Sequence, residues 1–270
     1  MRSHFPATDR SGDATTHASR RHKSLIRTHG RRIAAALAAG LLLLLAPALC
    51  RSAPAAPEEF PVVLGSFSTT LVGSLPARTQ NVRLAAAALD GATLEAGEVL
   101  SFNRQVGERS VARGYQAAPV ILHETRQIQI GGGVCQVAST LFAASILAGL
   151  TPYERWRHSS PVDYIALGED ATIAWGAKDL RLRNDLEQRI RLNAEIVGST
   201  LSVRVSGERE EDGTYELETI ENETVPGERG GGLDIDLYRV KKQGGEIVDR
   251  VLVHHDRYPP SQLLDAASGR

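Results

Sequence analysis

The sequence contains little sulfur and few aromatic side chains. Among its 270 residues are two cysteines and one methionine, and aromatic residues make up 5%. Cys50 ends an uncharged apolar run that begins at Ile33. If this run is removed on export, Cys135 is the single thiol left, so no intramolecular disulfide can form. Cys135 is then either a buried, inert residue or one kept for its reactivity.

An excess of charge is also missing, because the formal net charge is −1. This balance provides no electrostatic attraction for a polyanion, and we expect no nucleic-acid partner. The sequence also lacks Cys-x-x-Cys and His-x-x-x-His spacings, which are typical of zinc sites. We therefore expect neither a metal nor another cofactor.

The first 57 residues differ from the rest. Residues 1–32 are polar and basic, residues 33–50 are apolar, and Ala53 and Ala55 form an A-x-A cleavage pattern. This order is typical of a secretory signal peptide. The apolar run is also close to the shortest length that spans a bilayer, so an uncleaved signal anchor is the alternative. The basic flank places residues 1–32 in the cytoplasm and the remainder outside it.

The remainder is predicted to hold one α+β domain and a small appendage. Residues 58–206 alternate between strand-like segments and two helical segments, the first at Asn81–Gly91 with Asn81 as its N-cap. A hairpin with its turn at Gly198–Ser199 ends this domain. Residues 207–231 are polar and predict a linker. Residues 232–270 predict a β-hairpin, which turns at Gly244–Gly245, and a tail.

The stretch "GGGVCQVASTLFAASILAGL" places the thiol at the start of a predicted helix over residues 136–149. The N-terminus of a helix favours thiolate over thiol, because its N–H groups and dipole stabilise negative charge. Glycines up to Gly133 leave the sulfur uncrowded. The N–H groups of Cys135 and Gln136 are candidates for an oxyanion pocket beside it.

A base and an orienting carboxylate follow Cys135 in the sequence. His158 and Asp170 are each expected to open a strand, in "SPVDYIAL" and "DATIAWG", and the two strands to lie side by side. Asp170 would then orient His158, and His158 would activate Cys135. Arg155 is a candidate for the opposite face, near substrate carboxylates, although a residue in such a pattern more often lies on a solvated strand face. Each residue alone more often has a structural role: a core cysteine, a solvated histidine or a turn aspartate. It is their joint order that favours a site.

Several short motifs together resemble the VanW-like family of bacterial extracytoplasmic proteins. They are SFN at 101–103, GGGVCQ at 131–136, HS at 158–159 and GEDAT at 168–172. The resemblance covers residues 63–207. It implies a setting at the cell envelope and a link to glycopeptide resistance, in which the family's eponymous accessory protein takes part.

The segment "GVCQVASTLFAASILAGLTPYER" is also similar to the cysteine segment of transglutaminase-like proteins, and Cys135, His158 and Asp170 follow that superfamily's order. The usual aromatic residue after the histidine is replaced by Ser159. This resemblance implies an α+β fold with a transglutaminase-like core. In that core the helix bearing the cysteine packs on an antiparallel sheet, and a small C-terminal β-hairpin is added.

Two functions remain open at this point. In the first, Cys135 is the nucleophile of an amidase, peptidase or acyltransferase that acts on peptidoglycan-type peptides. In the second, the protein is a non-catalytic accessory protein that binds the envelope or peptidoglycan. A metal site at Cys135, His158 and His254–His255 lacks supporting spacing. A redox thiol would need a partner cysteine from another molecule. The expected location is extracytoplasmic, either secreted or anchored to the bacterial membrane by the N-terminal segment.

Overall fold

The computed structural model describes residues 59–122, 125–224 and 232–258. The expected signal segment, residues 1–57, and the tail after Pro260 lie outside the described residues. The chain divides into the units Met1–Pro54 and Ala55–Arg270, and everything described belongs to the second. In the described part, no helix combines the length and the apolar character needed to cross a membrane.

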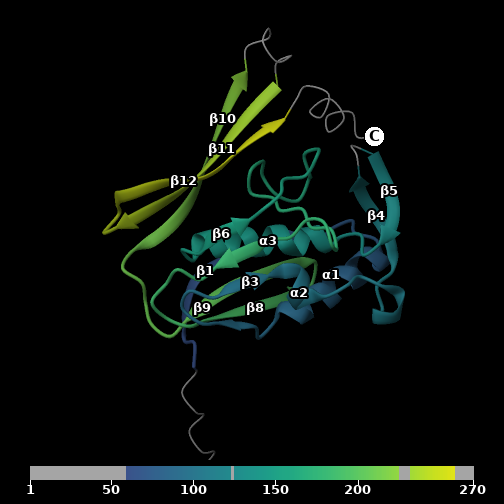
Figure 1. Cartoon of the computed structure of the whole chain (residues 1–270), viewed down its shortest axis with the longest axis horizontal. Helices are drawn as coiled ribbons and strands as arrows, with labels where there is room; N and C mark the ends of the chain where they lie inside the picture. Colours follow the sequence, from purple (N-terminus) through teal and green to yellow (C-terminus); the bar gives the residue numbers. More distant parts are fainter. Residues whose placement is uncertain (1–58, 123–124, 225–231, 259–270) are drawn as a thin grey trace, which may run out of the picture. The chain divides into compact units, whose positions relative to one another are not determined.

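A four-stranded antiparallel sheet forms the base of the fold (Figure 1). Its strand order is β1-β9-β8-β2, with bounds β1 Val62–Thr70, β9 Thr200–Gly207, β8 Ile190–Val197 and β2 Thr93–Leu94. Strands β8 and β9 pair from Ile190↔Gly207 to Val197↔Thr200, and Gly198 at the turn has a φ of 60°. This hairpin confirms the prediction for residues 189–207.

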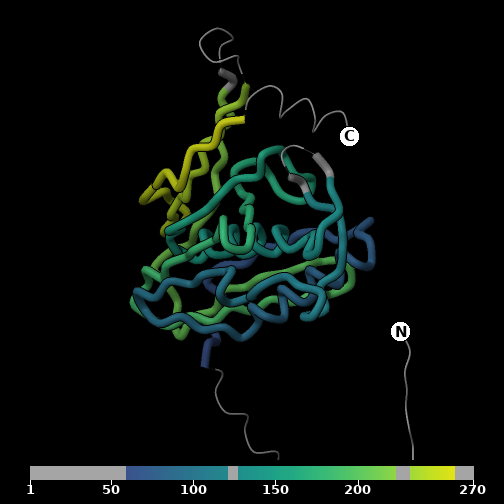
Figure 2. Tube along the Cα trace, turned by 45° about the vertical axis from the view of Figure 1, so that its right-hand side comes forward, coloured from purple at the N-terminus to yellow at the C-terminus, as the bar shows by residue number. Residues whose placement is uncertain are grey.

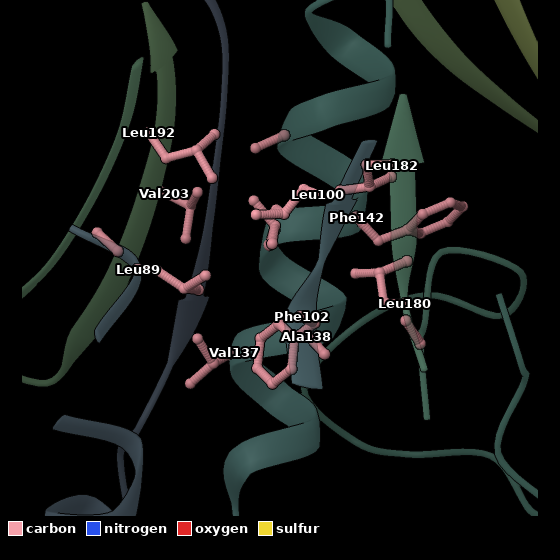
Figure 3. Close-up of a cluster of buried hydrophobic side chains, with 14 of the residues drawn as sticks. Leu89, Leu100, Phe102, Val137, Ala138, Phe142, Leu180, Leu182, Leu192 and Val203 are labelled. Atoms are coloured by element: carbon pink, nitrogen blue, oxygen red, sulfur yellow. The ribbon is translucent and has the colours of Figure 1, made fainter. Parts of the chain in front are cut away.

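Helix α3 (Val134–Leu147) is the centre of the core. It packs on β1 and β9, and it runs along the sheet in both views (Figures 1 and 2). Figure 3 shows Leu192 and Val203 on one side of the helix and Leu180 and Leu182 on the other. Twelve of its fourteen residues are buried. A helix that is buried on all sides needs apolar or small residues on most of its faces, and the sequence of α3 has them.

The second layer against α3 is a sheet of short strands in the order β3-β7-β6. Their bounds are β3 Val99–Ser101, β7 Arg181–Arg183 and β6 Thr151–Glu154. The remaining elements of this region are α1 Pro76–Leu89, α2 Phe102–Val106, the 3-10 turn Val111–Arg113, β4 Ala117–Leu122 and β5 Thr125–Ile130. Strands β4 and β5 form a hairpin, whose tip at 123–124 is outside the described residues.

The expected linker is wrong, because residues 207–231 contain strand β10 (Thr214–Thr224). It pairs along its whole length with β11 (Gly232–Gln243), which in turn pairs with β12 (Glu246–Tyr258). Glu216 and Glu218 alternate with Leu217, which packs against the core, because one face of an antiparallel sheet can remain in water. The predicted C-terminal hairpin is thus two strands of a three-stranded sheet.

This sheet is not a detached appendage. Leu237 of β11 is fully buried in the main hydrophobic cluster, and Leu217 and Val253 pack against that cluster. Arg239 donates a hydrogen bond from Nη1 to the carbonyl oxygen of Leu150, at 2.9 Å. Apolar burial of this kind is the main favourable term in folding. The sheet β10-β11-β12 therefore folds with the rest of the domain.

Two further expectations are wrong. The first helix begins at Pro76, and Asn81 lies inside it, fully buried, instead of capping it. Proline suits the first turn of a helix because its missing N–H would have no partner there. The segments 160–167 and 170–176 form no strands. Their backbone groups instead find partners in side chains and loops, as described next.

Candidate functional site

The start of α3 is held by a glycine turn. A Cβ atom on Gly132 would come within 2.4 Å of the carbonyl oxygen of Ala118, and Gly133 has a φ of 101°. Side chains other than glycine are strained in both settings. Asn81 donates a hydrogen bond from Nδ2 to the carbonyl oxygen of Gly132, at 2.9 Å. The turn therefore places Cys135, the second residue of the helix, in a fixed position.

Cys135 is half-buried as a residue, and its Sγ atom lies 3.6 Å from the carbonyl oxygen of Ile173. His158 lies close enough for its imidazole to lower the pKa of this thiol. A histidine next to a thiol is typical of a reactive cysteine, and an inert core cysteine has no need of one.

His158 and Asp170 form a buried pair beside the thiol. The Nδ1 atom of His158 lies 2.6 Å from Oδ2 of Asp170, and the His158 backbone N–H donates to the same oxygen at 2.7 Å. The two residues are 6% and 2% exposed. Because Asp170 holds Nδ1, the other ring nitrogen, Nε2, is the one able to exchange a proton.

Serine and backbone contacts bring this pair to α3, without the expected pair of strands. Ser139, one helical turn after Cys135, accepts a hydrogen bond from the Ala171 N–H at 2.9 Å. Its own hydroxyl donates to the carbonyl oxygen of Cys135, at 2.9 Å. The Thr172 N–H donates to the carbonyl oxygen of Trp156 at 2.6 Å. These bonds satisfy a buried loop that would otherwise carry unpaired polar groups.

The charges of these three side chains reinforce one another. Burial alone would lower the pKa of His158, but hydrogen bonds to Asp170 and Cys135 outweigh it and raise the pKa to about 9. Burial opposes ionisation of Asp170, yet His158 and Arg155 lower its pKa to about 2. Burial likewise opposes ionisation of Cys135, and the hydrogen bond and charge of His158 lower its pKa overall. The arrangement favours a thiolate–imidazolium pair.

Arg155 does not face a substrate, contrary to expectation. Its side chain is 6% exposed, and Nη2 donates to Oδ1 of Asp170 at 2.8 Å. Its Nη1 atom donates to both carboxylate oxygens of Asp256, on β12, at 2.7 and 2.6 Å. A buried guanidinium needs such partners, which a solvated strand face would not supply. Arg155 is therefore a positioning residue that links Asp170 to the C-terminal sheet.

Gln136 and Gly133, the residues considered for an oxyanion pocket, are engaged within the fold. Gln136 is 1% exposed, and its Nε2 donates to Thr69 Oγ1 at 2.9 Å and to the Thr70 carbonyl oxygen at 2.8 Å. Its backbone N–H donates to the carbonyl oxygen of Gly133 at 3.0 Å. A donor that is already paired inside the fold is not free for a developing oxyanion. Both residues instead anchor the start of α3.

Sequence reasoning missed four residues at this site. Ser139 and Asp256 are described above, and the Tyr164 hydroxyl lies 3.5 Å from Nε2 of His158. Arg109 lies close enough for its charge to lower the pKa of Cys135. Only Ser139 could have been found from the sequence, because it lies four residues after Cys135 and residues four apart share one face of a helix. The others come from loops or distant strands with no periodicity.

No metal site accompanies this arrangement in the described residues, where no group of three or more His, Cys, Asp and Glu side chains is placed to hold an ion. His254, from the alternative metal set, packs its ring against Phe142 at a centroid distance of 5.8 Å. His255 is bonded through Nδ1 to Asp236 at 2.7 Å. The fold and site together define an α+β protein with a half-buried cysteine beside a buried histidine–aspartate pair.

Comparison with known proteins finds similarity to one family. Residues 77–206 match the family described as VanW like protein, the family that the sequence motifs resemble. The uncharacterized protein YoaR of Bacillus subtilis is 38% identical over 140 residues, which are 52% of this chain and 46% of YoaR. The chain thus matches about half the length of that relative.

A second relative has a descriptive name. The vancomycin B-type resistance protein VanW of Enterococcus faecalis is 26% identical over 197 residues, which are 68% of this chain and 71% of that protein. No solved structure matches the chain. The resemblance of the core to transglutaminase-like proteins therefore stays a prediction.

The lowered pKa of Asp170 makes acid stability a test of the buried pair. A carboxylate whose pKa falls from 3.8 to about 2 on folding adds stability above pH 3.8 and loses it as the pH falls toward 2. We expect this residue to contribute about 2 kcal/mol to the loss of unfolding free energy over that range. Urea unfolding between pH 5 and pH 2.5 should show a shallower dependence for Asp170→Asn. Equal slopes would contradict the ionised pair.

Proposed function

We propose that the protein is an exported enzyme that uses Cys135 to cleave or transfer an acyl group at an amide bond. The observation that carries this proposal is the position of His158, which lowers the pKa of the Cys135 thiol and is held through Nδ1 by Asp170 at 2.6 Å. Nucleophile, base and orienting group stand in the relation that activates a thiol. A structural cysteine has no need of an ionised partner or of access to solvent.

The reaction follows from these positions. The Cys135 thiolate attacks the carbonyl carbon, forming the S–C bond and a tetrahedral intermediate. The imidazolium of His158 gives its proton to the leaving nitrogen, the C–N bond breaks, and a thioester and a free amine result. Water or a second amine then attacks the thioester, His158 accepts its proton, and the S–C bond breaks. Water gives hydrolysis, whereas an amine gives a new amide.

The substrate class is a cell-envelope peptide of the peptidoglycan type. Two features support it: the export pattern of residues 1–57 and the similarity to a protein named for vancomycin resistance. Glycopeptide antibiotics bind peptides of this kind, so a protein with such relatives has reason to act on them. The location proposed for residues 58–270 is extracytoplasmic, secreted or held at the membrane by the N-terminal segment.

Trapping the thioester tests the proposal directly. The purified chain would be incubated with a peptidoglycan stem peptide, L-Ala-γ-D-Glu-L-Lys-D-Ala-D-Ala, quenched in acid and measured by intact-protein mass spectrometry. We expect an increase equal to the acyl group, located on Cys135 and absent from Cys135→Ala. An unmodified wild-type protein over a series of stem peptides, with no released amine, would contradict the proposal.

The second candidate is a non-catalytic protein that holds such peptides. It is favoured by an open groove of about 600 Å³ on the same side of the domain as Ile173, lined in part by Trp175 and Lys178. Grooves with a few polar groups and aromatic walls are typical ligand sites. Peptide binding that is equal in the wild type and Cys135→Ala, with no adduct in either, would favour this candidate over the enzyme.

A further inference from the structure

The groove and the thiol share neighbouring residues. Trp175 lines the groove, two residues beyond Ile173, whose carbonyl oxygen contacts the Cys135 sulfur. Arg109 donates a hydrogen bond from Nη2 to Oδ1 of Asn103 at 2.8 Å, and Asn103 also lines the groove. The charge of the same Arg109 lowers the pKa of the Cys135 thiol.

The positive charges of the groove are not neutralised within the fold. Arg104 and Lys178 both line it, and in the described part of the chain neither forms an ion pair with a carboxylate. Arg104 is exposed and Lys178 partly so. Cations in a concave site attract a ligand of opposite charge.

The two acidic residues of the groove are instead committed to the fold. Asp179 accepts hydrogen bonds from the Asn103 N–H at 2.8 Å and from the Leu180 N–H at 2.9 Å, and its other oxygen accepts from Ser101. Glu154 accepts from the Trp156 indole at 2.9 Å. These bonds hold both carboxylates in place without removing their charge, so the four charged side chains of the groove sum to zero. Arg104 and Lys178 are the two that remain able to pair with a carboxylate of a ligand.

Both tryptophans of the chain stand at this place. Trp175 is 52% exposed and lines the groove, and the guanidinium of Arg109 lies 5.7 Å from its ring centroid. Trp156 is 46% exposed, and Lys178 Nζ lies 5.5 Å from its centroid. Large exposed aromatic side chains are uncommon on a surface without a ligand, since their burial on binding is favourable.

We propose that this groove binds the acidic part of a peptide substrate, with a carboxylate between Arg104 and Lys178 and the adjoining chain against Trp175. The proposal rests on the proposed function, because it assigns the groove to the substrate whose carbonyl reaches Cys135. Arg109 then separates the anchored carboxylate from the reacting thiol. A neutral sugar chain would not require the two unpaired cations, so the charge favours a peptide.

Tryptophan fluorescence can report on this groove, because the chain has two tryptophans and both are located here. The full chain carrying Cys135→Ser would be titrated with L-Ala-γ-D-Glu-L-Lys-D-Ala and with the same peptide amidated at both free carboxylates. We expect a fluorescence change for the acidic peptide and at least tenfold weaker binding of the amidated one. We also expect Lys178→Gln and Arg104→Gln each to weaken binding of the acidic peptide about tenfold.

Lys241→Gln is the matched control, since Lys241 lies 5.7 Å from the Tyr215 ring centroid on the distant sheet β10-β11-β12. It should bind as the parent does. Equal affinity for the acidic and amidated peptides would overturn the proposal, as would a fluorescence response to chitotetraose alone. Charge-dependent binding without an adduct in the trapping experiment would contradict the proposed cysteine chemistry but support the proposed binding groove. An adduct without charge-dependent binding would contradict the proposed groove but support the cysteine chemistry.

Discussion

Replacing Arg155 by methionine is expected to lower the free energy of unfolding by about 3–5 kcal/mol. The guanidinium bonds to Asp170 on one side and to Asp256 on the other, and all three side chains are less than 10% exposed. Its removal leaves two buried carboxylates facing each other without the positive charge between them. An uncompensated buried charge costs far more than the bonds of an exposed pair contribute.

Urea unfolding of Arg155→Met, followed by circular dichroism at pH 7, would measure this loss. Arg204→Met is the matched control, because Arg204 pairs with Glu195 at 3.0 Å while both side chains are about half exposed. Exposed pairs of this kind contribute less than about 1 kcal/mol. Similar losses in the two variants would show that the buried network adds no more than a surface ion pair.

Replacing His158 by glutamine is expected to reduce the reactivity of Cys135 at least tenfold at pH 6. The thiolate is the reacting form, and His158 is the main group that lowers the pKa of the thiol. Without it, burial raises that pKa, and each unit of increase reduces the thiolate fraction about tenfold. The rate of carbamidomethylation by iodoacetamide, followed by mass spectrometry, measures the change.

The same substitution should reduce kcat/KM for the acyl reaction by several orders of magnitude, up to about 10⁶, because a triad without its base retains only residual catalysis. His255→Gln is the control: His255 is half exposed and pairs with Asp236, away from the thiol. It should react as the wild type does in both assays. A His158→Gln protein that is alkylated at the wild-type rate would contradict the thiolate–imidazolium pair.

Much of the site was predictable because its parts are local in sequence. The glycine turn and the apolar run fix the start of α3, and so the position of Cys135. The order of cysteine, histidine and aspartate predicted that His158 and Asp170 would pair, and they do. The secondary structure around the pair was predicted wrongly. His158 and Asp170 were each expected to open a strand, whereas both lie in loops, which Ser139 connects to α3.

The errors at Arg155, Gln136 and β10 have a common physical origin. Sequence pattern shows which side chains are polar, but it does not show which polar partners the fold brings to them. Arg155 meets Asp256, which is 101 residues away, and Gln136 meets Thr69, which is 67 residues away. In β10 the charged side chains suggested a linker, although an antiparallel strand tolerates them on its exposed face.

The sheet that carries Asp256 affects how this chain should be divided for study. The family match covers residues 77–206, whereas β1, which anchors Gln136, precedes it and β12, which holds Arg155, follows it. A fragment limited to residues 77–206 would lack β1, which holds the start of α3 through Gln136. It would also lack Asp256, which holds Arg155, the residue that pairs with Asp170. For expression, the smallest useful piece runs from β1 through β12. Relatives that align only over the matched span must meet both needs with residues of their own.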